Sequence, residues 1–160
     1  MFCDELKIKV IAGKGGDGCV SFRREKFVPK GGPDGGDGGH GGDVILKVNP
    51  HLNTLSHLTN GKTYKAPKGG NGMGKNMTGR SAEALIIEVP LGTIIYDEKT
   101  KEFIDDLNKK DSEIMIAKGG KRGLGNARFV SSVHQVPRFA ETGENGQEKT
   151  LKLELKLVAD

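Results

Sequence analysis

Residues 30–43 read Lys-Gly-Gly-Pro-Asp-Gly-Gly-Asp-Gly-Gly-His-Gly-Gly-Asp, and we expect the rest of the chain to be organised around them. Glycine recurs here at every third position, at Gly32, Gly35, Gly38 and Gly41. A period of three fits neither an α-helix nor a strand, but it matches the polyproline II helix, which has no internal hydrogen bonds. Such a helix has a face without side chains, so the stretch predicts close packing of one backbone against another.

The tripeptide Lys-Gly-Gly returns at residues 14–16, 68–70 and 118–120. The spacing of these echoes is unequal, which argues against a solenoid of stacked repeats. We predict that several glycine rows lie side by side as polyproline II helices beside a β-barrel, with the amides of one row meeting the carbonyls of another. The alternative is a set of disordered linkers, which the composition also allows.

Strands are expected between the glycine stretches. Residues 6–11 and 148–158 alternate apolar and polar side chains, as a strand with one buried face does. Residues 20–28 fit either a strand edge with a charged face or a binding segment. Long helical periodicity is absent, so we predict a mainly β fold. The other expected strands are 43–48, a hairpin of 54–58 and 62–65, two strands within 84–96, one around 103–104, and 113–117.

Composition limits the function. The chain has 25 Lys and Arg against 21 Asp and Glu, so nucleic-acid binding would need local basic patches. The absence of Trp and the few aromatic residues argue against a stacking platform for single-stranded bases. Cys3 and Cys19 stand apart, which fits a reducing compartment better than a disulfide or zinc site. Without a signal sequence or an apolar stretch of membrane-spanning length, we expect a cytoplasmic protein with no membrane span.

Two ligand motifs are only apparent. Residues 69–75 satisfy the G-x-x-x-x-G-K part of a phosphate-binding loop, but Asn76 stands where Ser or Thr is required and the strand-loop-helix context is missing. The acids Asp34, Asp37 and Asp43 suggest calcium-binding repeats, yet those have nine-residue units with an apolar position. Aspartates here favour hydrogen bonds to neighbouring amides, and an extracellular calcium-binding β-roll is the third reading. We predict no metal site and no catalytic residues.

Basic residues gather at the glycine stretches. Backbone amides of glycine loops can approach phosphates, and Lys and Arg add attraction that does not depend on sequence. Loops of this kind suit a structured RNA that is read by shape and backbone, whereas the plain alternative is that the lysines only solubilise the loops. The predicted RNA-binding residues are Arg23, Arg24, Lys26, Lys30, Lys68, Lys75, Arg80, Lys118, Lys121, Arg122 and Arg128.

Residues 22–43, together with 72–76, 89–93 and 119–126, closely resemble the N-terminal domain of the Obg (CgtA) family of ribosome-associated GTPases. The resemblance runs in order through essentially all 160 residues. It implies the Obg fold, in which a glycine-rich cluster of six polyproline II helices is set on an eight-stranded β-barrel. The glycine-rich projection would be built chiefly from residues 12–43, 66–80 and 118–146.

The resemblance also implies a function. Members of the family bind the large ribosomal subunit and its rRNA through the loop tips, which reach toward the peptidyl transferase centre, and they act in subunit maturation and the stress response. They continue past Asp160 into a GTP-binding domain, where GTP and magnesium are expected. We therefore expect this chain to be non-catalytic and to bind no cofactor or nucleotide. The alternative is a protein-interaction scaffold that docks onto its own GTPase domain or onto stress-signalling proteins.

Overall fold

The structure is a computed structural model that describes residues 2–23, 31–131 and 136–157. The predicted RNA-binding residues Arg24, Lys26 and Lys30 lie outside the described residues. The described chain is mainly β, as predicted, and its single helical element is a short 3₁₀ helix. The elements are β1 (Phe2–Ile11), β2 (Val44–Val48), β3 (Thr63–Lys65), β4 (Leu85–Val89), β5 (Thr93–Asp97), β6 (Phe103–Leu107), β7 (Glu113–Ala117), η1 (Asn126–Phe129) and β8 (Glu148–Leu157).

The strands form two sheets. The larger has the order β3-β1-β8-β5-β6, and the smaller has the order β4-β2-β7. The predicted closed barrel is therefore wrong, because both sheets end on edge strands, β3 and β6 in one and β4 and β7 in the other, within the described residues. These edge strands have three or five residues each, whereas β1 and β8 have ten and pair with one another over their whole length.

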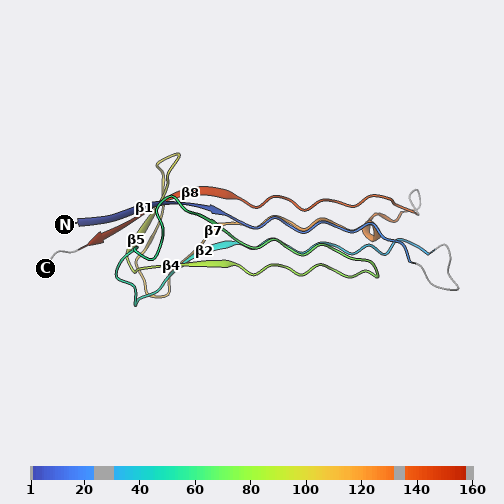
Figure 1. Ribbon diagram of the computed structural model, residues 1–160, viewed down its shortest axis with the longest axis horizontal. Coiled ribbons are helices and arrows are strands. Elements are labelled where there is room, and N and C mark those ends of the chain that lie inside the picture. Colours follow the sequence, from blue (N-terminus) through green and yellow to red (C-terminus); the bar gives the residue numbers. More distant parts are fainter. Residues whose placement is uncertain (1, 24–30, 132–135, 158–160) are drawn as a thin grey trace.

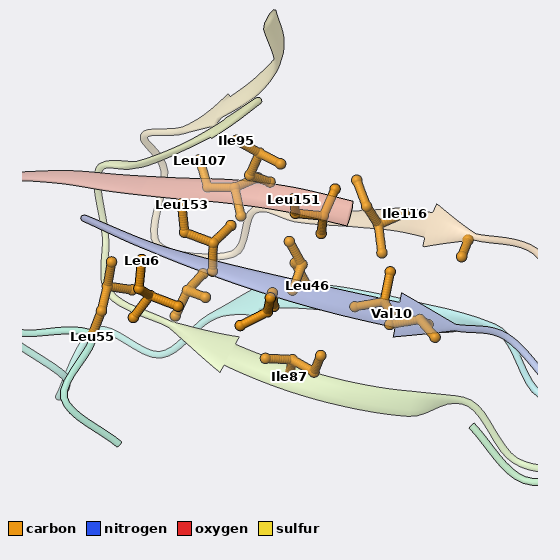
Figure 2. Close-up of a cluster of buried hydrophobic side chains, with 14 of the residues drawn as sticks. Leu6, Val10, Leu46, Leu55, Ile87, Ile95, Leu107, Ile116, Leu151 and Leu153 are labelled. Atoms are coloured by element: carbon orange, nitrogen blue, oxygen red, sulfur yellow. The ribbon is translucent and has the colours of Figure 1, made fainter. Parts of the chain in front are cut away.

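The hydrophobic core lies between the two sheets (Figure 2). Because β1 and β8 alternate apolar and polar residues, each sends every second side chain inward, and Leu6 pairs in register with Leu153. Leu46 of β2 meets this layer from the smaller sheet and is completely buried. Full burial of one such side chain contributes about 1.5–3 kcal/mol, so this core anchors the long segments that leave it.

Two strand predictions differ from the structure. The predicted hairpin of 54–58 and 62–65 is wrong, because β3 pairs in parallel with β1, Thr63 opposite Lys9, and residues 54–58 form turns. Leu55 nevertheless enters the core, and its amide donates a 2.9 Å hydrogen bond to the Asp4 carboxylate. In the segment predicted as a strand edge, the described residues 20–23 make only an isolated bridge between Phe22 and Pro33.

A long projection leaves one side of the two sheets (Figure 1). The chain enters it after β1, β3 and β7 and returns from it into β2, β4 and β8. Its rows run side by side and are neither helix nor strand. Within the described residues, the rows are 12–19, 34–43, 66–73, 77–84, 118–125 and 141–147.

Backbone hydrogen bonds link the rows at intervals of three residues. The amides of Gly13, Gly16 and Cys19 donate to the carbonyls of Gly42, Gly39 and Gly36 at 2.8–2.9 Å. Ala12, Gly15 and Gly18 donate in the same way to residues of the 141–147 row. In the row 12–19, successive amides thus donate to two different neighbouring rows, so these segments form a hydrogen-bonded array and are not independent linkers.

The array leaves no room for side chains at most of its glycines. A Cβ built on Gly35, Gly38 or Gly41 would overlap the backbone carbonyl of Cys19, Gly16 or Gly13, respectively. Gly32 differs, because apart from its two chain neighbours no described residue has an atom within 4 Å of the position that its Cβ would take. The period-three glycines of the sequence therefore include three sites of backbone contact and one open site.

Candidate nucleic-acid interface

The aspartates of the glycine stretches bind backbone amides across the rows. Asp43 Oδ1 accepts a 2.7 Å hydrogen bond from the Gly119 amide, and Asp37 Oδ1 accepts a 2.9 Å bond from the Gly125 amide. Asp34 Oδ2 accepts a 3.1 Å bond from the Lys75 amide. The prediction that these acids serve the backbone is confirmed. In the part of the chain that the structure describes, no three His, Cys, Asp or Glu side chains come together as metal ligands would.

Asp37 also forms the shortest ion pair among the described residues of the projection. Its side chain is only 5% exposed, and Arg128 Nη2 lies 2.7 Å from Oδ2, while Arg122 Nη1 lies 3.9 Å away. Burial raises the pKa of Asp37, but the hydrogen bonds from Arg128 and the Gly125 amide outweigh it and hold the pKa below its ordinary value. Arg122 and Arg128, which are two of the predicted RNA-binding residues, therefore neutralise a buried carboxylate.

Asn126 joins several rows near the far end of the projection, where η1 begins. It is completely buried. Its Oδ1 accepts a 2.8 Å hydrogen bond from the Gly35 amide, and its Nδ2 donates to the carbonyls of Ser21 and Pro137 at 3.0 Å. One side chain thus satisfies backbone groups from three separate parts of the chain.

Replacing Asn126 by alanine is expected to lower the free energy of unfolding by about 2 kcal/mol, because it leaves a buried amide and carbonyl without partners. Chemical denaturation with urea measures this loss. Asn145→Ala is the control, since Asn145 is exposed, and it should change stability by less than about 0.5 kcal/mol. Equal losses in the two variants would contradict the role of Asn126.

The structure regroups the basic residues that the sequence had placed together. Lys118 and Lys121 line one hollow of about 480 Å³ with His40, and Lys68 and Arg80 line another of about 460 Å³. Arg23 and Lys75 line a third hollow near the far end of the projection. Lys118 follows β7 directly, whereas Arg128 belongs to η1, so the third sequence group is spread from the base of the projection to the 3₁₀ helix.

The first two hollows share Ser81 and Ala82, so they flank the same returning row. Together they make a side of the projection that we call the lateral basic face, defined by Lys68, Arg80, Lys118 and Lys121 with His40 between them. All of these side chains are exposed. Neither His40 nor Ser81 was predicted from the sequence, although His40 is the one non-acidic side chain between the glycine pairs of residues 35–43.

The described part of the chain contains no helix that could span a membrane.

The family model described as GTP1/OBG matches residues 3–157. The chain is 54% identical over 159 residues to the GTPase Obg of Thermodesulfovibrio yellowstonii, an alignment that covers 99% of this chain and 47% of that relative.

Two further relatives have the same name. The chain is 55% identical to the GTPase Obg of Limosilactobacillus reuteri over 160 residues, and 49% identical to that of Acidobacterium capsulatum. Both alignments cover 100% of this chain but only 36% and 47% of the relatives. The chain thus spans less than half the length of these relatives. With a family model that matches nearly every residue, the chain belongs to the GTP1/OBG family, as the resemblance of its glycine stretches implied.

Proposed function

We propose that this chain is the N-terminal, non-catalytic module of a ribosome-associated GTPase and that it binds the rRNA of the large ribosomal subunit. The observation that carries the proposal is the lateral basic face, in which the exposed side chains of Lys68, Arg80, Lys118 and Lys121 gather along the glycine rows. Lys and Arg attract phosphates without regard to sequence. A stiff, cationic side of this kind suits an RNA surface that is read by shape.

The enzymatic part of the protein belongs elsewhere in this proposal. The relatives are named GTPases, and this chain covers less than half of each. GTP and magnesium would then bind in a separate domain beyond residue 160, and the 160-residue chain alone would show no affinity for GTP. The wider role would be in subunit maturation and the stress response, in the cytoplasm.

We also infer that the rows of the projection are polyproline II helices. Their three-residue hydrogen-bond interval supports this, since polyproline II has three residues per turn and leaves its own amides unpaired. Gly125 has φ −74° and ψ 163°, close to the values of that helix. A bundle of such helices would hold the basic side chains at fixed spacing.

A second candidate function is protein docking through the smaller sheet. Ile86, Ile45 and Met115 are aligned across β4, β2 and β7 on the face away from the core. Ile86 and Met115 are each 51% exposed, which makes an apolar row on the outer surface. The partner would be the protein's own GTPase domain or a stress-signalling protein.

The variant Lys118→Gln/Lys121→Gln is expected to bind large ribosomal subunits more weakly and to reduce the salt dependence of binding by about two units of slope, one for each lost phosphate contact. Co-sedimentation with large subunits at several salt concentrations measures both effects. Arg122 and Arg128 are left intact because they neutralise Asp37.

The matched control is Lys109→Gln/Lys110→Gln. These exposed lysines lie in the turn before β7, at the opposite end of that strand from Lys118, and the charge change is the same. The control should bind as the wild type does. Equal salt slopes in all three proteins would contradict the lateral basic face as the RNA contact, and binding to proteins but not to naked rRNA would favour the docking function.

A further inference from the structure

His40 lines the first hollow of the lateral basic face, the one of about 480 Å³ that it shares with Lys118 and Lys121. We propose that His40 binds RNA as a neutral hydrogen-bond donor, with its Nε2–H directed at an oxygen of a backbone phosphate. The inference rests on the proposed function and deepens it, since it names the atom of this chain and the group of the RNA that meet in the hollow.

Asp37, His40 and Asp43 recur at intervals of three and face the same neighbouring row, residues 118–125. The two aspartates accept hydrogen bonds from glycine amides of that row at 2.9 and 2.7 Å. Between them, His40 Nδ1 accepts a longer bond, of 3.4 Å, from the Arg122 amide. The register of the two rows therefore sets the direction of the ring. An aspartate in its place would satisfy the amide as its neighbours do, but it would add a negative charge to the lateral basic face.

The bond from Arg122 decides which nitrogen of the ring carries the hydrogen. A backbone amide only donates, so the ring nitrogen that faces it is an acceptor and the neutral ring carries its hydrogen on Nε2. The two nitrogens lie on opposite sides of the imidazole, so Nε2–H is turned away from the row 118–125. In the described part of the chain no protein atom accepts this hydrogen, and the side chain is exposed. The donor is therefore open to a ligand.

The backbone of His40 is fixed from the other side. Its amide donates to Ser81 Oγ at 3.2 Å, and the Ala82 amide donates to the His40 carbonyl at 2.9 Å. His40 is thus tied to the row 77–84 by its backbone and to Arg122 by its ring. A donor that is already held in place loses little conformational freedom on binding, which favours contact with a fixed RNA surface.

The charges of the first hollow select an anion. Lys118 and Lys121 are exposed there, and the acid among the described lining residues, Asp43, already accepts the Gly119 amide. Because the cations outnumber the acid, an anionic oxygen is attracted, and the neutral N–H beside them adds a directed bond. The second hollow adjoins the first through shared lining residues, which fits a chain of phosphates better than a single ion. The RNA backbone presents such oxygens at every nucleotide.

His40→Asn separates the ring from its backbone role. Asparagine can accept from the Arg122 amide, as Asp37 and Asp43 accept from glycine amides, but it is shorter and has no donor where Nε2 stood. We expect the variant to keep the wild-type melting temperature. In fluorescence anisotropy at about pH 8, where histidine rings are generally neutral, it should bind a short RNA duplex roughly three- to tenfold more weakly. The loss should be the same for duplexes of unrelated sequence, because the contact is to the backbone.

The salt dependence distinguishes this donor from a further cation. A neutral hydrogen bond releases no counterion, so His40→Asn should leave the slope of log affinity against log salt unchanged, whereas Lys118→Gln should reduce it by about one unit. His51→Asn is the matched control, since His51 is exposed in the turn after β2, and it should bind as the wild type does. Unchanged affinity in a folded His40→Asn, a loss that depends on the RNA sequence, or a slope reduced as in Lys118→Gln would each overturn the inference.

A measurement on the wild type decides the question even if His40→Asn does not fold. Nitrogen-15 NMR of the imidazole rings should show the hydrogen of His40 on Nε2. Addition of the duplex should shift the Nε2 signal of His40 and leave that of His51 in place. A ring with its hydrogen on Nδ1, or a His40 signal that does not respond to the RNA, would overturn the inference.

Co-sedimentation keeps this inference apart from the proposed function. If the wild type sediments with large subunits and His40→Asn binds the duplex equally well, the proposed function stands and His40 is rejected as a donor. A chain that binds the duplex through His40 but does not sediment with large subunits supports the inference and rejects the ribosomal role. A wild type that does not bind the duplex overturns the inference, and binding of inorganic phosphate in its place would assign the hollow to a free ion.

Discussion

Replacing Gly38 by alanine is expected to lower the free energy of unfolding by about 3 kcal/mol or more, the upper end of the range for overpacking. The new Cβ would overlap the carbonyl group of Gly16 and lie 2.9 Å from its Cα, so all the opposing atoms are backbone. Neither row can move aside easily. The Gly38 amide donates to Gly123 at 2.9 Å and the Gly16 amide donates to Gly39 at 2.8 Å, which fixes both rows in the array.

Gly32→Ala is the matched control, since the substitution and the sequence motif are the same. Apart from its chain neighbours, no described residue has an atom within 4 Å of the new Cβ, and Gly32 is not in the left-handed region that favours glycine. Its stability should change by less than about 0.5 kcal/mol. In thermal unfolding, the melting temperature of Gly38→Ala should be lower than that of the wild type by roughly 6–12 °C at this chain length. Similar melting temperatures for the two variants would mean that the rows can separate without cost.

The sequence predicted the existence of backbone contacts in the projection, but not the partners in each contact. The period of three at Gly35, Gly38 and Gly41 indicates a face without side chains, and the structure places a neighbouring carbonyl against each of them. Gly32 has the same spacing and no such neighbour. Periodicity describes one row, whereas a contact needs a second row whose register is set by the strands at its base.

The candidate site was harder to predict, because proximity in sequence is a poor guide where rows reverse direction. Lys68, Lys75 and Arg80 form one group in the sequence. The chain turns back between Met73 and Met77, where the Met73 amide donates a hydrogen bond to the Met77 carbonyl. Arg80 therefore returns beside Gly70 and close to Lys68. Lys75 stays at the turn. The prediction of a closed barrel was wrong for a related reason. The alternation of apolar and polar residues identifies the strands, but it does not say which strands pair along their edges.

Asp37 and Arg128 are 91 residues apart, so their pairing could be found only from the structure. The charge count of the sequence treats Arg128 as one more cation available to RNA. In the structure it donates two hydrogen bonds from Nε and Nη2 to a carboxylate that is 5% exposed. Substituting Arg128 would therefore test folding and RNA binding at once, which makes Lys118 and Lys121 the cleaner targets for binding.

Replacing Asp37 by asparagine is expected to lower the free energy of unfolding by about 2–3 kcal/mol at pH 7, because it removes the charge-assisted hydrogen bonds between a buried carboxylate and Arg128, whose own side chain is 56% exposed. Asparagine can still accept from the Gly125 amide, so the loss reports the charge. The control is Asp111→Asn at an exposed turn, which should be nearly neutral. Urea denaturation at pH 7 compares the three proteins.

The pH dependence of this difference tests its electrostatic origin. Asp37 has a pKa below its ordinary value in the folded chain, so its charge stabilises the fold above the unfolded-state pKa of about 3.9, and this stabilisation is lost as the pH falls through the lower folded-state pKa. The gap between wild type and Asp37→Asn should therefore be constant from pH 7 to about pH 5 and shrink below about pH 4. A gap that stays constant to pH 2.5 would show that the side chain acts through shape and not through its charge. Because the other acids are common to both proteins, the difference isolates the carboxylate that joins Gly125 and Arg128 to the centre of the projection.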